Sequence, residues 1–277
     1  MSILVSRIPD NNIGHIFFFD IIKYYSENYT SVFIDDTNID KNNKCQIWRL
    51  YVMEKLYKQH IEYTQDKSIV NEQTLPSYNA WKFIEYKPEF NLINLVNKLA
   101  SPKKGKYILL NIRKHNRILY DYKTKLKLEM FFNYKEFKIP FIWCCFDDMT
   151  VDEQSKICSE AAIFIGVHGA GCTNLIFLPK ESPLVEINFR THWYCDPVCD
   201  DHFYNKISIN DKCNGRLHYV DTFHKADFHN ICHLIDKKYK EIEAVEYQGR
   251  FLSRDPNSKT DIYIDGDALY QYIESLF

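Results

Sequence analysis

Short apolar runs alternate with helical patterns along the second half of the chain. The runs lie at 107–112, 141–145, 164–167 and 184–187. Continuous apolar runs of this length are typical of parallel strands that are buried on both faces. Between them, 123–132 and 151–161 have helical patterns, and Thr150 with Glu153 has the spacing of a capping box. This alternation predicts an α/β fold with a Rossmann-like domain built on a parallel sheet.

A second Rossmann-like unit is predicted in the first hundred residues. Short strands are expected near 3–5 and 32–34, and helices at 16–25, 46–60 and 91–99. The segment 101–105 has the sequence SPKKG, which favours a linker. We therefore expect an amino-terminal domain at 1–100, a linker at 101–105 and a carboxyl-terminal domain at 106–245.

The last part of the chain is predicted to be mainly helical. Strands are expected within 205–222, followed by helices at 224–243 and 261–277. The segment 246–277 would then carry its helix back onto the amino-terminal domain.

Three glycines within six residues, Gly166, Gly169 and Gly171, end the apolar run at 164–167. A strand, a tight turn and a helix start are expected there, and the strand at 184–187 completes a βαβ unit. Such units bind ligands at the carboxyl ends of their strands, and glycines with a helix N-terminus favour an anion. A phosphate or diphosphate cradle is predicted on Gly169, Ala170, Gly171, Cys172 and Thr173. The alternative is a turn that only reverses the chain.

Two arginines, Arg113 and Arg117, follow the predicted strand at 107–112. At the mouth of a buried strand, a guanidinium can bind a diphosphate through two parallel hydrogen bonds. The alternative is a solvated basic surface, with the side-chain stems packed on apolar neighbours.

The composition is that of a folded globular protein, with 45% hydrophobic and 26% charged residues among 277. The net charge of −2 gives no reason to expect nucleic acid as a partner, whereas a small nucleotide needs only a few local cations. No run of about 18 apolar residues occurs, so we expect a soluble protein without a membrane span. Nine scattered cysteines indicate reduced thiols and a cytoplasmic location.

The segment 192–202 holds four residues of the kinds that ligate zinc. They are His192, Cys195, Cys199 and His202. One contiguous segment rarely surrounds a tetrahedral ion without a paired hairpin, so a loop that lines a cleft is the ordinary alternative. His229 and His233 are four residues apart but have no glutamate or third ligand in a metallohydrolase spacing. We expect no metal site, and a zinc-stabilised interaction module stays open as an alternative.

Several motifs resemble, in this order, the carboxyl-terminal signature of glycosyltransferase family 61. They are FDDMT at 146–150, SEAA at 159–162, GVHGAGCTN at 166–174 and FLPKESPLVEI at 177–187. Upstream, NIRKHNRIL at 111–119 is similar to the basic strand-loop of the family, and NNIGHIFFFD at 11–20 is similar to its amino-terminal segment. Cys172 stands where the family usually has a larger aliphatic residue.

The resemblance implies an inverting glycosyltransferase of the GT-B type, with two Rossmann-like domains facing a central cleft. The donor would be a UDP-sugar, with xylose favoured over GlcNAc and arabinose. The acceptor would be a hydroxyl of a glycan or glycoprotein, joined through a β linkage. No cofactor and no essential divalent metal is expected, because helix N-termini and cations can stabilise the departing UDP. A protein of this fold that binds nucleotide sugars without turnover is the alternative.

The resemblance also implies roles for individual residues. His15 and Asp20 are the candidate general bases, against the alternative of a locally bonded histidine and a solvated helix face. The donor-binding residues would be Arg113, Arg117, His168, Gly169, Ala170, Gly171, Cys172, Thr173, Asn174 and Glu186. Among them the arginines would neutralise the departing UDP, His168 would position the donor, and Glu186 would accept ribose hydroxyls. A soluble enzyme rich in Lys, Asn and Ile would suit a large DNA virus acting in the host cytoplasm or carried in the virion.

Overall fold

The computed structural model of the chain describes residues 2–5, 13, 31–35, 40, 42–57, 61–64, 93–114, 118–119, 139–189, 191–194, 217–220, 227–246, 261–264 and 266–277. The predicted helices at 16–25 and 123–132 lie outside these residues, as do His15, Asp20 and Arg117. The part of the candidate zinc segment at 195–202 lies outside them too. The described residues include all of 139–189, which contains the glycine turn.

Seven strands among the described residues form one sheet, the large sheet. Its order is β5 (Ile118–Leu119), β12 (Asp261–Ile264), β11 (Tyr239–Glu246), β8 (Leu184–Phe189), β7 (Ala161–Val167), β4 (Tyr107–Asn111) and β6 (Phe141–Cys144). Neighbouring strands from β11 to β6 are parallel, whereas β12 is antiparallel to β11 and β5 pairs parallel with β12. The parallel α/β sheet predicted from the apolar runs is confirmed.

The order of the five parallel strands decides where a ligand site belongs. Numbered along the chain, β4, β6, β7, β8 and β11 lie in the order 2-1-3-4-5, which is one of the two common orders of doubly wound sheets. After β4 the chain adds β6 on one side of β4, and it then adds β7, β8 and β11 in succession on the other side. In such sheets ligands bind at this switch point, beside the carboxyl ends of the two central strands. Here the switch point lies between β4 and β7.

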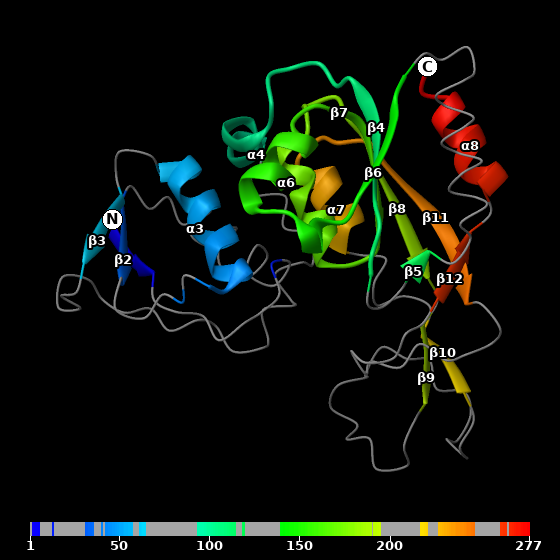
Figure 1. Ribbon diagram of the computed structural model, residues 1–277, viewed down its shortest axis with the longest axis horizontal. Helices are drawn as coiled ribbons and strands as arrows, with labels where there is room; N and C mark the ends of the chain where they lie inside the picture. Colours follow the sequence, from blue (N-terminus) through cyan, green and yellow to red (C-terminus); the bar gives the residue numbers. More distant parts are fainter. Residues whose placement is uncertain are drawn as a thin grey trace.

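Both faces of the large sheet are covered by helices. One apolar cluster includes side chains from α3 (Lys44–Tyr57), α4 (Ile93–Leu99), α6 (Val151–Cys158), α7 (Asp227–Leu234) and the 3-10 helix η6 (Ala170–Phe177). The other cluster contains Leu269 and Ile273 of α8 (Gly266–Glu274). Figure 1 shows α6 and α7 on one side of the sheet and α8 on the other. Burial on both faces explains why the parallel strands are continuously apolar.

Helix α6 begins with the predicted capping box. The Glu153 N–H donates to Thr150 Oγ1 at 3.3 Å, and the Thr150 N–H donates to Glu153 Oε2 at 2.8 Å. This hydrogen bond from the Thr150 backbone lowers the pKa of Glu153. The helix ends at Cys158, earlier than predicted, because β7 already begins at Ala161.

The predictions for the last fifty residues are partly wrong. The segment 224–243 holds helix α7 and then strand β11, which pairs with β8, rather than one helix. Alternating burial of Ile242 and Ala244 gives β11 the period of a strand. The segment 261–277 likewise starts with β12 before α8. As far as the described residues show, helix α8 packs on the large sheet rather than on the amino-terminal part, because its apolar face completes the second core cluster.

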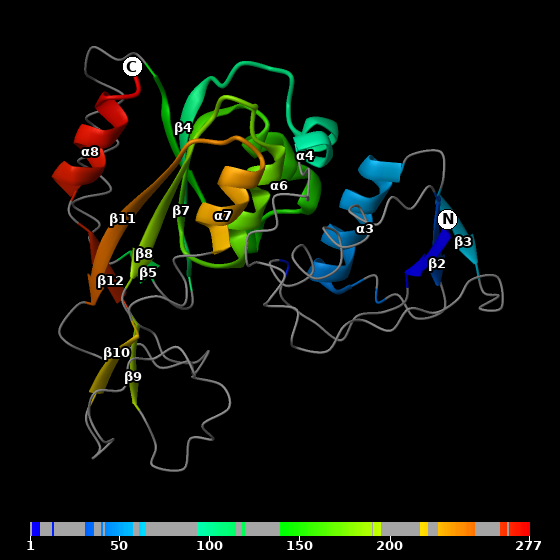
Figure 2. The same ribbon diagram turned by 180° about the vertical axis from the view of Figure 1, so that it is seen from behind.

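Among the described residues, the amino-terminal part contains a small parallel sheet and the helices α3 and α4. Strands β1 (Ser2–Val5), β2 (Ser31–Asp35) and β3 (Ile61–Thr64) form it in chain order. Figure 2 shows α3 between this sheet and the large sheet. Trp48 of α3 and Leu95 of α4 are buried in the same cluster as Phe177 of η6. Helices α3 and α4, which precede the predicted linker, therefore share a core with the carboxyl-terminal sheet. The GT-B arrangement of two facing domains stays a prediction.

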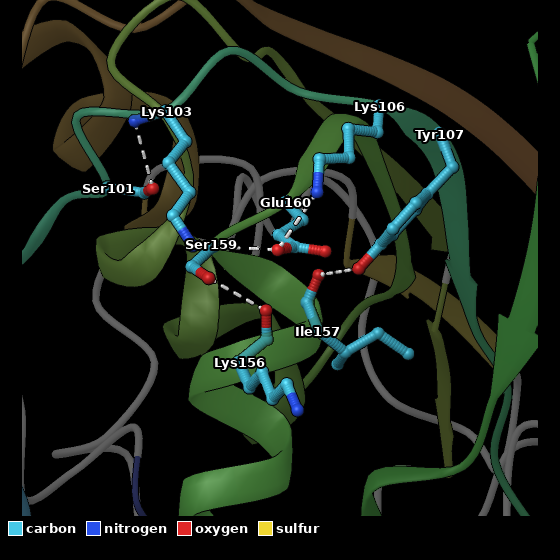
Figure 3. Close-up of polar contacts among 8 residues, drawn as sticks. All are labelled: Ser101, Lys103, Lys106, Tyr107, Lys156, Ile157, Ser159 and Glu160. Carbon is cyan, nitrogen blue, oxygen red and sulfur yellow. Dashed lines mark hydrogen bonds and ion pairs between the residues drawn. The ribbon is translucent and has the colours of Figure 1, made fainter.

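The predicted linker at 101–105 is bound to the end of α6, as Figure 3 shows. Glu160 forms ion pairs with Lys106 at 3.2 Å and Lys103 at 3.6 Å. The Tyr107 hydroxyl donates to the Ile157 carbonyl at 2.6 Å. A Cβ added to Gly105 would lie 2.2 Å from the Ala162 Cα, so a larger residue would push the segment away from β7. The amino ends of β4 and β7 are therefore held together opposite the switch point.

A buried lysine holds the turn between η6 and β8. Lys237 is 6% exposed, and its Nζ donates to the carbonyls of Pro179 at 2.6 Å and Lys180 at 3.1 Å. Burial lowers the pKa of Lys237 to about 8. The folded chain therefore releases this proton at a lower pH than the unfolded chain, whose lysine has a pKa of about 10.4.

The Lys237→Met variant tests this anchor. As pH rises from about 8 to about 10.4, the unfolding free energy of the parent should increase relative to the variant by about 2 to 3 kcal/mol, because only the unfolded parent still binds the proton. Urea unfolding of both proteins at several pH values measures the difference. A difference that does not change over this range would contradict the lowered pKa.

Candidate functional site

A buried amide joins the carboxyl ends of β4, β6 and β7 at the switch point. Asn111, the last residue of β4, is 4% exposed, and its Oδ1 accepts from the Phe146 N–H at 3.1 Å. A Cβ added to Gly171 would lie 2.8 Å from Asn111 Nδ2, a contact that real Cβ atoms essentially never make. A glycine at 171 therefore allows the loop after β7 to approach the end of β4.

The loop after β7 has the tight turn that the glycines predicted. Gly169 has φ 143° and ψ −174°, a region that is open almost only to glycine. The Cys172 N–H donates to the Gly169 carbonyl at 2.9 Å, and η6 begins at Ala170. The first N–H groups of a helix have no acceptor within it, so those of Ala170 and Gly171 belong to the end that favours an anion. Gly169, Ala170 and Gly171 are partly exposed.

The next three residues of the turn are buried behind it. Cys172, Thr173 and Asn174 are each 0% exposed, so their side chains support the turn from inside. A Cβ added to Gly166 would lie 2.7 Å from Cys172 Sγ, which shows how closely the thiol packs on β7. Burial raises the pKa of Cys172 well above its usual value, so the thiol stays neutral. Within the described residues, the Thr173 hydroxyl has no hydrogen-bond partner.

Asn174 connects the turn to two other elements. Its Oδ1 accepts from Trp48 Nε1 of α3 at 3.1 Å, and its Nδ2 donates to Gln154 Oε1 of α6 at 2.9 Å. Gln154 Nε2 in turn donates to the Phe146 carbonyl at 3.0 Å. These buried hydrogen bonds hold η6 against α3, α6 and the end of β6. Asn174, predicted to bind the donor, instead lies in this network.

Arg113 and His168, both expected to bind the donor, are in contact. Arg113 Nη1 donates to the His168 carbonyl at 3.1 Å, which holds the guanidinium across the gap between the chain ends of β4 and β7. Burial lowers the pKa of Arg113, and the nearby Asp147 carboxylate acts in the opposite direction. Since an arginine has an ordinary pKa above 12, the group remains a cation. It is thus a partly buried positive charge beside the glycine turn.

His168 and Glu186 also meet, but in the interior. Glu186 is 0% exposed; its Oε1 lies 2.5 Å from His168 Nδ1, and its Oε2 accepts from the Tyr239 hydroxyl at 2.6 Å. The predicted contact of Glu186 with ribose hydroxyls does not fit this position, because both oxygens are enclosed by protein. The role was an expectation from the family resemblance, which assigns a residue along the chain but does not show which face it occupies.

Three residues without a predicted role belong to this region, namely Lys44, Asn111 and Asp147. Asn111, within the motif at 111–119, is the last residue of β4, and Asp147, within the motif at 146–150, lies in the short 3-10 helix that follows β6. Lys44 Nζ at the start of α3 donates to the Asp147 carbonyl at 2.6 Å. The neighbouring Lys114 pairs with Asp148. The position of Asn111 at the end of a strand, and of Asp147 in the segment after the next strand, was the available signal. Nothing in the sequence placed α3 beside them.

Together these features are those of a doubly wound α/β protein whose switch point offers backbone N–H groups and a guanidinium. The family model described as Glycosyltransferase 61 matches residues 17–185, which is more than half of the chain. The chain therefore belongs to glycosyltransferase family 61, as its motifs indicated. No curated protein matches the chain. The matched range contains the glycine turn, Arg113 and His168.

Two further observations concern the described residues alone. None of their helices has both the length and the apolar character needed to cross a bilayer. No group of three or more His, Cys, Asp or Glu side chains in this part of the structure could hold a metal ion. The metal-independent reaction and the cytoplasmic location stay predictions.

A double-mutant cycle tests the close approach of Gly171 and Asn111. Gly171→Ala should lower the unfolding free energy by about 1 to 3 kcal/mol, because the new methyl group overpacks against the amide. In the Asn111→Ala background the same change should cost less than half as much, since the amide is gone. Urea unfolding of the four proteins measures the coupling. Equal costs in both backgrounds would mean that the amide is not the obstacle.

Proposed function

We propose that this family 61 protein transfers a sugar from a UDP-sugar to a hydroxyl of a glycan or glycoprotein, with inversion and formation of a β linkage. Xylose is the favoured sugar, ahead of GlcNAc and arabinose. Family membership supports the transferase class. The observation that supports the donor site is the hydrogen bond of Arg113 to the His168 carbonyl, directly before the Gly169–Gly171 turn at the switch point of the sheet.

In this proposal the turn and the arginine hold the diphosphate. The N–H groups of Ala170 and Gly171 stand where a helix start favours negative charge. Arg113 adds a full positive charge at the same edge of the sheet. Arg117, which lies outside the described residues, is proposed to bind the diphosphate together with Arg113. The buried side chains of Cys172, Thr173 and Asn174 keep the turn in place from behind.

The proposed transfer is a single displacement. The acceptor oxygen attacks C1 of the sugar, the bond from C1 to the UDP oxygen breaks, and its electrons go to the diphosphate. Arg113 and the helix start stabilise that developing charge, which is the kind of electrostatic term that lowers a barrier most. The acceptor proton passes to a general base, for which His15 and Asp20 remain the proposed residues. No divalent ion is required by this scheme.

Binding of UDP tests the donor site. At about 100 times its Kd, UDP should stabilise the parent by about 2.7 kcal/mol and raise its Tm by about 5 degrees. Arg113→Met should remove most of this rise, because the charge at the turn is lost. Lys114→Met is the matched control, since it removes the neighbouring exposed cation that pairs with Asp148. A variant at 113 that responds to UDP like the parent would refute the role of Arg113.

Turnover separates the enzyme from a nucleotide-sugar-binding protein without turnover. The parent should release UDP from the preferred donor when a glycan acceptor is added, and the Tm rise with UDP-xylose, UDP-GlcNAc and UDP-arabinose should rank the donors. A coupled UDP assay measures the release. UDP binding without release from any donor and acceptor pair would favour the binding protein.

A further inference from the structure

A chain of hydrogen bonds crosses four strands of the large sheet behind the glycine turn. The Tyr239 hydroxyl on β11 donates to Glu186 Oε2 at 2.6 Å, and Glu186 Oε1 on β8 lies 2.5 Å from His168 Nδ1. His168 follows β7, and its carbonyl accepts from Arg113 at 3.1 Å, beyond the end of β4. The start of β11 is thus linked to the arginine at the switch point.

The chemistry of Tyr239 decides which group is the donor in its hydrogen bond with Glu186. Burial raises the pKa of Tyr239, and Glu186 raises it further, so the phenol keeps its proton and is the donor. A carboxylate accepts on both oxygens. Glu186, which accepts from Tyr239 through Oε2, therefore presents Oε1 to a proton on His168 Nδ1. The hydrogen bond at one ring nitrogen sets the tautomer of a histidine.

Glu186 and Tyr239 are placed to support a site, not to touch its ligand. Glu186 is 0% exposed. Tyr239 pairs in register with Leu184, the first residue of β8, and so lies at the amino end of the sheet, away from the switch point. Helix α7 covers this series of hydrogen bonds. The centroid of the Phe228 ring lies 6.0 Å from that of the His168 ring, and the centroid of the His229 ring lies 5.2 Å from that of the Tyr239 ring.

We propose that Glu186 and Tyr239 are positioning residues of the donor site. They hold the His168 ring in one tautomer and one orientation, and through the His168 backbone they hold the Arg113 guanidinium beside the turn. The backbone of His168 is fixed as well, because its N–H donates to the Ile187 carbonyl at 2.9 Å. The tautomer and orientation of the His168 ring are properties of the protein alone, whereas the effect on donor binding rests on the proposed function.

The tautomer of His168 is measured in the nucleotide-free protein. Long-range proton–nitrogen correlation spectra of the full chain with labelled histidine should show His168 protonated at Nδ1, with the signal assigned by a His168→Gln variant. Glu186→Met has a similar size but no acceptor, so the Nδ1-protonated form should lose its dominance. An Nδ1 without a proton in the parent, or an unchanged spectrum in Glu186→Met, would overturn the proposal.

UDP affinity measures the effect on the donor site. One hydrogen bond has a net value of about 0.5 to 1.5 kcal/mol, or a factor of about 2 to 13 in Kd. We expect Kd for UDP to rise about tenfold in Glu186→Met and about threefold in Tyr239→Phe, as measured by calorimetry. Tyr270→Phe is the matched control, because Tyr270 forms the same kind of bond with Glu274 at 2.8 Å on α8, which packs on the other face of the large sheet. Its Kd should equal that of the parent.

Each result has one meaning. An unchanged Kd in folded Glu186→Met overturns the positioning role, as does an equal loss in the Tyr270→Phe control. If Glu186→Met does not fold, Tyr239→Phe and Glu186→Gln decide by the same two measurements. A parent that does not bind UDP overturns the proposed function and the donor half of this inference, and the histidine spectra then decide the other half.

Discussion

The structure depends on how closely the chain ends of β4 and β7 approach each other. Gly171 leaves room for the Asn111 amide, and that amide holds the Phe146 N–H at the end of β6. A side chain at 171 would separate the three chain ends and expose polar groups that are now paired. Because the parallel order places β4 and β7 side by side, this contact also defines the switch point.

Several buried polar groups around the site are paired with one another. Asn174 joins η6 to α3 and α6, and Glu186 joins β8 to β7 and β11. An unpaired buried polar group is costly, so such networks favour one arrangement of the elements that carry them. The backbone of the turn and the Arg113 guanidinium are therefore held in position before any ligand arrives, which is what electrostatic stabilisation of a departing diphosphate requires.

Helix α3 gives the two parts of the chain a common core. Trp48 donates a hydrogen bond to Asn174 and packs in the same cluster as Phe177, although more than a hundred residues separate them. A change in the amino-terminal part can therefore reach the turn through α3. The segment at 101–105, which has the composition of a linker, is likewise bound closely to the end of α6 and to β7.

From the sequence, four of the five parallel strands, the capping box of α6, the glycine turn, the position of Arg113 just beyond β4 and the family could be predicted, because each is a local pattern of periodicity or motif. Strand β11, the position of α8, and the partners of Asn174 and Glu186 could not. They depend on which strands become neighbours and which face each side chain occupies. The sequence alone thus determined these four strands and the backbone turn at the glycines. Only the tertiary structure decided that Glu186 lies inside, since burial and pairing between distant segments are properties of the folded chain.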